Sequence, residues 1–382
     1  MRKINMIISL VLTFVLSSIL TLNNKVKASD NINENNESYY LYDYNSNTVI
    51  LSKNENKRMP IASMTKIMLL LLCYENIENN NVSLDTEITI SKNAKSMGGS
   101  QVYLEEGDTY SMSDLLKSIT VASANDASVQ MAEYFYGSEQ TCVDAMNKKA
   151  NELGLENTLF ANVTGLPKPM QYSSAKDISI IYSRLLNYEK YFNYSTIWTD
   201  KIEHKKGHTE ITNTNKLVKF YEGCDGGKTG FTNEAGFCLT ATAKRGNMRL
   251  IASVLKGATS KDRFNTISSL FNYGFNNYTN KVVIDKELPI DEKLSISGGK
   301  VDNVTCVYEK DYYVFSKRNE SQNIEIVNNF NKVKAPLKKG DIVGEAIIYK
   351  DTVEIAKVNI LSGENVEKLT YFDNIKKIIG SW

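Results

Sequence analysis

A serine and a lysine lie three residues apart in the segment PIASMTKIMLLLL, where Ser63 and Lys66 stand at the start of a long apolar run. If this run is a helix, side chains at positions i and i+3 share one face, so the hydroxyl and the amine can meet. A serine becomes a useful nucleophile when a base takes its proton, and a lysine is such a base when burial or nearby positive charge lowers its pKa. The apolar run would supply the burial, so the pair predicts an acyl-transfer nucleophile with its base.

Two further short motifs follow this pair in order. Ser123 and Asn125 form an S-x-N sequence that starts 60 residues after Ser63. Lys228 opens a K-T-G sequence 105 residues after Ser123. Each motif alone occurs by chance, but S-x-x-K, S-x-N and K-T-G in this order are the signature of penicillin-binding proteins and class A β-lactamases.

The remaining composition argues against several other classes of protein. The chain has 45 basic and 44 acidic residues, so it has no excess charge for binding nucleic acid. The two histidines, His204 and His208, lack the adjacent glutamate of a zinc protease, and we expect them to be structural or exposed. The five cysteines show no metal-binding spacing, and we expect neither a metal nor a cofactor. Buried free thiols are favoured, with a Cys224–Cys238 pair as an open alternative.

The N-terminal segment has the pattern of a secretory signal. Arg2 and Lys3 precede an apolar run, and Ala28 stands at a plausible cleavage site. We therefore expect a signal peptide at 1–28 and export, with a retained membrane anchor as the alternative. The polar segment 29–38 is predicted to be a flexible leader.

The elements that must position the motifs suggest one α+β catalytic domain over 39–280. Residues 39–51 read as a β-hairpin, and the apolar run from Ile61 to Cys73 reads as a buried helix. Other helices are expected near 113–120, 124–136, 139–153, 174–187 and 261–275, and strands within 225–256. Strands at both ends of this domain predict one sheet closed by its first and last segments.

The C-terminal part of the chain has a different character. Residues 281–363 form short β-rich pieces and predict a small all-β sandwich domain, with a bulge where the alternation changes phase between Ile355 and Val358. The tail, 364–382, predicts an amphipathic helix. Its apolar stripe consists of Val366, Leu369, Phe372, Ile375, Ile378, Ile379 and Trp382.

At its three motifs the sequence resembles the low-molecular-weight penicillin-binding proteins that are serine-type D-alanyl-D-alanine carboxypeptidases. The similarity extends through MGGSQVYLEEGD at 97–108, NELGLENTLFANVTGLP at 151–167 and the segment 213–246. It implies a catalytic domain of the serine β-lactamase type, a β-sandwich behind it and a terminal helix on the outer face of the cytoplasmic membrane. The implied substrate is a peptidoglycan stem peptide ending in D-Ala-D-Ala, and β-lactams are the implied covalent inhibitors.

The resemblance also implies roles for single residues. Ser63 would take the acyl group of the penultimate D-alanine, and Lys66 would be its base. Ser123 would pass a proton to the leaving amine, while Asn125 would help to bridge Lys66 and the substrate.

In the third motif the resemblance assigns substrate binding. Lys228 would add positive charge, Thr229 would meet the terminal carboxylate, and Gly230 would keep the strand edge open. The backbone N–H groups of Ser63 and Phe231 would hold the oxyanion.

Three alternatives share these motifs: a β-lactamase, a non-catalytic penicillin-binding or sensing module, and an endopeptidase acting on cross-links. A class A lactamase needs a glutamate that holds the deacylating water, and Glu156 lies in only an approximate match to that motif. Two departures from many relatives, Gly227 before Lys228 and Gln171, bear on peptide preference rather than on reaction class.

Overall fold

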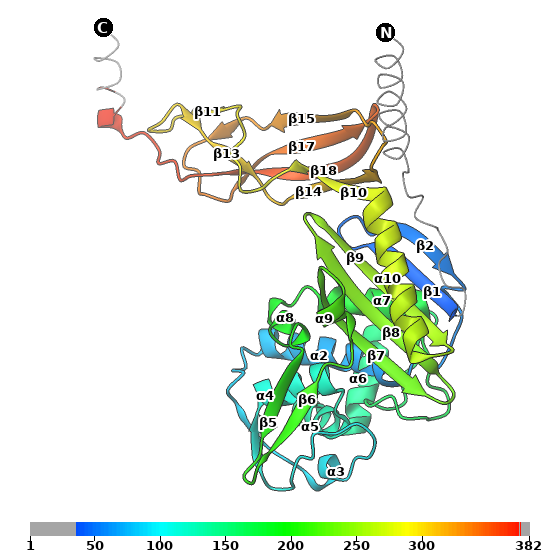
Figure 1. The fold of residues 1–382 in the computed structure, drawn as a ribbon. Coiled ribbons are helices and arrows are strands. Elements are labelled where there is room, and N and C mark those ends of the chain that lie inside the picture. The colour runs from blue at the N-terminus through cyan, green and yellow to red at the C-terminus, as the bar shows by residue number, and fades with distance from the viewer. Residues whose placement is uncertain (1–35, 374, 376–382) are drawn as a thin grey trace, which may run out of the picture.

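A computed structural model describes residues 36–373 and 375, which form a larger mixed α and β domain and a smaller β domain (Figure 1). The predicted signal peptide, 1–28, and residues 29–35 of the predicted leader lie outside the described residues. Residues 36–38 were also expected in the leader, but β1 begins at Asn36. Asn36 and Ser38 are buried because both make long-range hydrogen bonds: Asn36 Nδ2 donates to Thr266 Oγ1 at 2.6 Å, and Ser38 Oγ donates to the carbonyl of Asn54 at 3.0 Å.

The larger domain is built on one antiparallel sheet in the order β2-β1-β9-β8-β7. Its strands are β1 (Asn36–Asp43), β2 (Val49–Lys53), β7 (Cys224–Thr232), β8 (Gly236–Arg245) and β9 (Met248–Gly257). The predicted closure of one sheet by both ends of the domain is therefore confirmed. Strand β7 lies at an edge of this sheet, so within the described part of the chain no strand pairs with one side of its backbone.

Helices cover both faces of the sheet. Helix α10 packs along one face, and α2 and α7 lie on the other, as Figure 1 shows. Every residue of α2 from Lys66 to Tyr74 is buried, which explains why the sequence shows an unbroken apolar run rather than a stripe. The helical segments are η1 (Ala62–Thr65, 3₁₀), α2 (Lys66–Asn79), α3 (Lys92–Lys95), α4 (Met112–Lys117), η2 (Ser118–Ala122, π), α5 (Asn125–Tyr136), α6 (Glu139–Glu152), α7 (Ala175–Leu185), α8 (Glu189–Ser195), α9 (Leu217–Phe220) and α10 (Ser260–Asn277).

Two small two-stranded sheets complete the larger domain. They pair β3 (Glu87–Thr89) with β4 (Thr109–Ser111) and β5 (Thr199–Glu203) with β6 (His208–Thr212). His204 lies between β5 and β6, where its ring nitrogens contact the hydroxyls of Tyr110 and Thr209 at 2.7 and 2.8 Å. His208 is exposed, so the structural and exposed roles expected for the histidines are confirmed.

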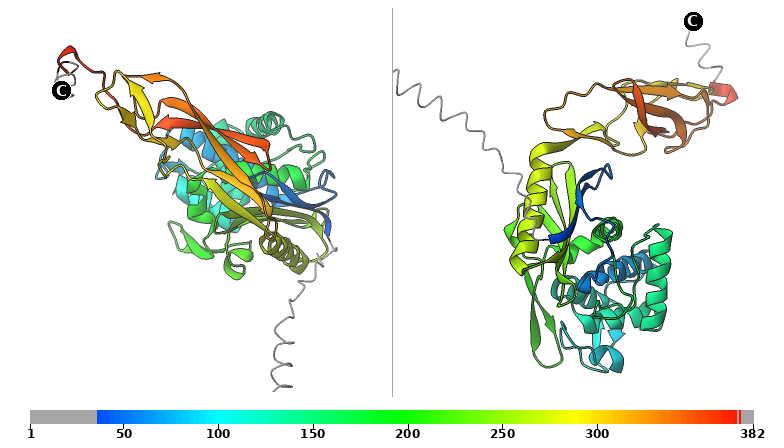
Figure 2. Two further views of the ribbon diagram at one scale, coloured as in Figure 1. Left: turned by 90° about the horizontal axis from the view of Figure 1, so that it is seen from above. Right: turned by 90° about the vertical axis from the view of Figure 1, so that its right-hand side faces the viewer.

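The β domain follows α10 directly and lies at one end of the molecule (Figure 2). Its first strand begins at Tyr278, three residues before the predicted boundary at 281. Ile355 of β18 is left unpaired between Glu354, opposite Tyr349, and Ala356, opposite Ile348, so the predicted bulge is confirmed. The strands are β10 (Tyr278–Ile284), β11 (Leu294–Ser297), β12 (Asn303–Val304), β13 (Cys306–Tyr308), β14 (Tyr312–Lys317), β15 (Ile324–Phe330), β16 (Val333–Lys334), β17 (Ile342–Lys350) and β18 (Val353–Ser362).

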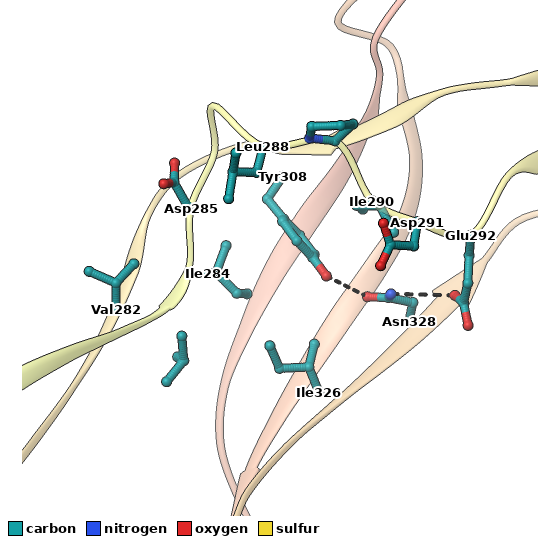
Figure 3. Close-up of a pocket in the computed structure, with 12 residues that line it drawn as sticks. Val282, Ile284, Asp285, Leu288, Ile290, Asp291, Glu292, Tyr308, Ile326 and Asn328 are labelled. Atoms are coloured by element: carbon teal, nitrogen blue, oxygen red, sulfur yellow. Dashed lines mark hydrogen bonds between the residues drawn. The ribbon is translucent and has the colours of Figure 1, made fainter.

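A hollow of about 640 Å³ lies between the end of β10, the following loop and β15 (Figure 3). Tyr308 donates to Asn328 Oδ1 at 3.2 Å, and Asn328 Nδ2 donates to Glu292 at 3.4 Å across one side of it. All of its lining residues belong to the β domain. It therefore contains none of the residues of the three motifs.

The predicted start of the terminal helix at 364 is wrong. Val366 is buried in the core of the β domain and forms a β-bridge with Leu337, so it does not belong to a surface stripe. Described helical residues begin at 371, after Thr370, whose hydroxyl accepts from the backbone N–H of Asp373 at 3.2 Å. Residues 374 and 376–382 lie outside the described residues.

The cysteines are all free and buried, as the sequence favoured. Cys224 and Cys238 lie on neighbouring strands, but Cys224 is opposite Ala243 and Cys238 is opposite Gly230. Six residues of strand register therefore separate them, about 20 Å along the sheet, which excludes the open alternative of a disulfide. Within the described part of the chain, no helix has the length and apolar character needed to span a bilayer.

Candidate active site

The three motifs meet where η1 and α2 pack against the edge strand β7. At this contact the strand approaches the segment before Ser63 so closely that a Cβ on Gly230 would lie 2.5 Å from the carbonyl oxygen of Ile61. A distance this short leaves no room for any side chain. The glycine of the K-T-G motif therefore allows β7 to lie directly against the start of α2.

Ser63 and Lys66 lie on the same turn, with Lys66 Nζ 3.1 Å from Ser63 Oγ. Lys66 is fully buried and also donates to Asn125 Oδ1 at 2.7 Å and to the carbonyl oxygen of Thr164 at 2.5 Å. A neutral amine has two N–H groups and one lone pair. Because two carbonyl-type acceptors occupy the N–H groups, the lone pair is left for the hydroxyl of Ser63.

The environment of Lys66 favours this neutral form. Burial is the main reason why the pKa of Lys66 is held well below its ordinary value, and the positive charge of Lys228 adds to the effect. The carboxylate of Asp126 opposes the shift but is the smallest of the three influences. The apolar run that the sequence placed behind Lys66 thus has the expected electrostatic effect.

Ser123 is held in an unusual backbone conformation at the second motif. It ends the π-helix η2 with a left-handed φ of 63°, directly before α5. Ala62, which precedes the nucleophile, is also left-handed, with φ of 48°. Non-glycine residues in this region are strained, and such strain is common at functional sites.

Lys228 connects the second and third motifs. Its Nζ donates to Ser123 Oγ at 2.6 Å, and burial together with the charge of Arg263 lowers its pKa to about 7. Asn125 is oriented by donating from Nδ2 to the carbonyl of Gly98 at 2.7 Å. The motif residues therefore form two hydrogen-bonded groups. Lys66 bonds to Ser63 and Asn125 in the first, and Lys228 bonds to Ser123 in the second. The two groups lie together because Ser123 and Asn125 are only two residues apart.

The other residues predicted for the third motif also lie on β7, and the carbonyl oxygen of Thr229 accepts from Lys228 Nζ at 3.2 Å. Thr229 is buried, with 6% of its surface exposed, and Phe231 is half-exposed with its ring stacked on Phe237 at 4.3 Å between centroids. The free edge of β7 offers backbone donors and acceptors for an extended peptide, as an added strand would use them. This edge and the Ser63 hydroxyl together suit acyl transfer to or from a peptide.

The sequence did not reveal two groups that complete the site. The carbonyl of Thr164 accepts from Lys66, and every residue has such a carbonyl, so residue type carries no signal for it. Arg263 of α10 donates to the carbonyl of Gly230 at 3.1 Å and stacks on Phe237 and Phe264. The hydrogen bond connects α10 to β7 at the K-T-G motif. A single arginine in an amphipathic helix is not informative by itself.

Substitution of Gly165, next to Thr164, by alanine tests whether its close contact with the nucleophile segment positions Ser63. Its φ is +84°, and a Cβ would lie 2.0 Å from the carbonyl oxygen of Ala62, so the segment that carries Ser63 must move. We expect Gly165→Ala to lower the free energy of unfolding by about 1–3 kcal/mol and to slow acylation by a penicillin at least about tenfold. Thermal melting and the rate of adduct formation by mass spectrometry measure the two effects.

Gly154→Ala is the matched control because Gly154 has φ of +69°, and a Cβ added there would meet nothing within 4 Å. Gly154→Ala should lower the free energy of unfolding because alanine is strained at this φ, but it should leave the acylation rate unchanged. Equal acylation by both variants would show that the contact with Ala62 does not position the nucleophile.

Comparison with known proteins follows the division of the chain into two domains. Residues 24–259 match the Peptidase S11 family, described as D-alanyl-D-alanine carboxypeptidase, and residues 278–368 match the C-terminal domain of penicillin-binding protein 5. D-alanyl-D-alanine carboxypeptidase DacF of Bacillus subtilis is 36% identical over 352 residues, which are 91% of this chain and 90% of that protein.

Two further relatives match along nearly the same length. D-alanyl-D-alanine carboxypeptidase DacA of Escherichia coli is 30% identical over 360 residues, with 91% of this chain and 88% of that protein covered. The crystal structure of penicillin binding protein 5 from Haemophilus influenzae has a TM-score of 0.68 and 27% identity, and covers 87% of this chain and 98% of that chain. The predicted α+β catalytic fold with a C-terminal β domain is thereby confirmed.

Proposed function

The chain belongs to the D-alanyl-D-alanine carboxypeptidase family, and on this premise we propose that it removes the terminal D-alanine from peptidoglycan stem peptides through an acyl-enzyme on Ser63. The observation that carries the proposal is the buried Lys66 amine, 3.1 Å from Ser63 Oγ with both N–H groups satisfied elsewhere. A low-pKa amine in this position is suited to take the serine proton.

The reaction proceeds in two steps. Ser63 Oγ attacks the carbonyl carbon of the penultimate D-alanine as Lys66 takes its proton, and the N–H groups of Ser63 and Phe231 bind the oxyanion. Ser123 then passes a proton to the leaving amine and receives in turn the proton that Lys66 took, the C–N bond breaks and free D-alanine departs. Water hydrolyses the resulting ester, which releases the shortened peptide and returns the proton to the serine.

The substrate is held by the third motif and by Asn125. Thr229 and the charge of Lys228 meet the terminal carboxylate of the substrate, and Gly230 keeps the strand edge open to the peptide backbone. Asn125 contacts the substrate amide while it holds Lys66. A β-lactam, which mimics the D-Ala-D-Ala end, acylates Ser63 and remains bound as a slowly hydrolysed ester.

The experiment that tests this proposal measures D-alanine released from a synthetic pentapeptide ending in D-Ala-D-Ala. We expect one D-alanine per peptide and one penicillin adduct per protein. A sensing module would form the adduct without releasing D-alanine, and a β-lactamase would hydrolyse nitrocefin rapidly. An endopeptidase would cleave cross-linked peptides instead, so each alternative has its own readout.

We further propose that the protein acts outside the cytoplasmic membrane, after export by the segment 1–28, and that its C-terminal tail lies on the membrane surface. Tyr371 and Phe372 support the surface role because they are 76% and 75% exposed at the start of the tail helix. Aromatic side chains of this kind bind at a membrane interface.

Deletion of 370–382 tests the membrane role without disturbing the β domain. The cut leaves Leu369, whose N–H donates to the carbonyl of Gly298 at 2.9 Å, and Val366 in place. The chain beginning at residue 29 should sediment with anionic lipid vesicles, and the truncated chain should stay in the supernatant. Equal sedimentation of both chains would contradict the role of the tail. Unchanged thermal melting of the truncated chain is the control for folding.

A further inference from the structure

A second hollow, of about 520 Å³, lies beside the candidate active site in the larger domain. Its walls come from three segments that also build the site. Met59 and Pro60 lie just before the nucleophile segment, Pro167 follows the Thr164–Gly165 turn, and Glu234 lies in the turn after β7. The hollow therefore adjoins the site on the side where β7 ends.

The direction of a bound peptide leads toward this hollow. This step rests on the proposed function, in which Thr229 holds the terminal carboxylate and the N–H of Phe231 holds the scissile carbonyl. A substrate aligned with the free edge of β7 then has its last residue near Thr229, and its preceding residues continue past Phe231. The turn that contains Glu234 comes next, so the residue before D-Ala-D-Ala lies at the hollow.

The lining of the hollow is apolar with charges of both signs. Met170, 70% exposed, and the ring of Tyr172 provide apolar surface. Glu234 has no ion-pair partner among the residues that the structure describes. Lys168 donates one N–H to the carbonyl of Ala161 at 2.9 Å and has two more to offer.

The second cation of the hollow is already engaged. Arg58 donates to Asn157 Oδ1 at 3.2 Å and to the carbonyl of Glu156 at 3.0 Å, and its guanidinium lies 5.0 Å from the centroid of Tyr172. It is therefore a wall of the hollow rather than a free ligand group. Glu234 and Lys168 are left as one acceptor and one donor for a ligand.

We propose that this hollow is a subsite for the side chain of the residue before D-Ala-D-Ala, and that it selects a diamino diacid. In a peptidoglycan stem this residue is a diamino acid, with an aliphatic stem that ends in an amine or in an amine and a carboxylate. The stem packs on Met170 and Tyr172, the amine meets Glu234, and the carboxylate of the diacid meets Lys168. Glu234 and Lys168 are thus specificity-determining residues.

The test compares D-alanine release from four pentapeptides that differ only at the third residue: diaminopimelate, lysine, Nε-acetyl-lysine and norleucine. For the full protein we expect kcat/KM to rise from norleucine to lysine by about 2- to 10-fold, and from lysine to diaminopimelate by a similar factor. Acetyl-lysine should behave like norleucine because it keeps the stem and loses the charge.

Two variants test which charged residue recognises which group of the side chain. The readout is the ratio of kcat/KM between two peptides, because a general loss of activity lowers both values equally and leaves their ratio unchanged. Glu234→Gln should remove the preference for lysine over norleucine, and Lys168→Met should remove the preference for diaminopimelate over lysine. Glu222→Gln is the control, because Glu222 is an exposed carboxylate just before the other end of β7, and it should keep both preferences.

Equal kcat/KM for all four peptides with the unaltered protein would overturn the subsite and leave the carboxypeptidase proposal intact. Preferences that survive in both variants would also overturn it, because another part of the protein would then select the side chain. If no peptide released D-alanine, the proposed function would fail and the subsite with it.

Discussion

Replacing Ser63 by alanine will abolish the covalent penicillin adduct and lower the turnover of D-Ala-D-Ala peptides by about 10⁴- to 10⁶-fold. The reason is that the acyl-enzyme cannot form without the hydroxyl that lies 3.1 Å from Lys66 Nζ. Intact-mass analysis after incubation with a penicillin measures the adduct, and D-alanine release measures turnover.

The control for this variant is Ser52→Ala, which makes the same chemical change at an exposed position on β2. It should form one adduct and release D-alanine at the normal rate. An adduct of the same mass on Ser63→Ala would mean that another residue is the nucleophile, and the assignment of the site would be wrong.

Replacing Lys66 by methionine should slow acylation by about 10²- to 10⁴-fold, the usual contribution of general base catalysis. Methionine fills a similar volume without an amine, so Asn125 Oδ1 and the carbonyl of Thr164 each lose one donor, at a cost of about 1–3 kcal/mol each. Lys66→Met also removes the free-energy cost of burying an amine, and this gain offsets part of the stability lost with the two hydrogen bonds. The rate of penicillin acylation and the thermal melting temperature measure the two effects separately.

The pH dependence of acylation provides the sharper test of Lys66. Because burial and the charge of Lys228 hold the pKa of Lys66 well below its ordinary value, the amine is neutral above that lowered pKa and protonated below it. Acylation by the unaltered protein should therefore fall as the pH decreases through this pKa. The residual acylation of Lys66→Met should lack this acid limb, and an unchanged limb would show that another group is the base.

Much of the local structure follows from patterns within short segments. The apolar run after Lys66 is long enough to indicate a buried helix, and the alternation that changes phase near Ile355 indicates a bulged strand. Both expectations hold because they depend on side-chain periodicity. The three motifs could likewise be recognised because each is defined by residue types at a fixed spacing within a short segment.

The predictions that failed depend on contacts between distant segments. Val366 fits the spacing of an amphipathic helix, yet it lies in the β domain because Leu337 pairs with it. Asn36 reads as part of a polar leader, yet it is buried in β1 by its bond to Thr266, 230 residues away. Neither partner is visible in the local pattern, since the free energy that fixes these residues comes from tertiary contacts.

The residue types and their order along the chain already indicate which groups can do the chemistry: a hydroxyl, an amine one turn later, and two further polar motifs on separate elements. How the amine is held, by contrast, depends on contacts between segments that are distant along the chain. Its two N–H groups are satisfied by Asn125 and by the carbonyl of Thr164, and its pKa is lowered by burial beside Lys228. The physical reason is that desolvation and hydrogen-bond direction depend on all the atoms packed around the amine, whichever segments supply them.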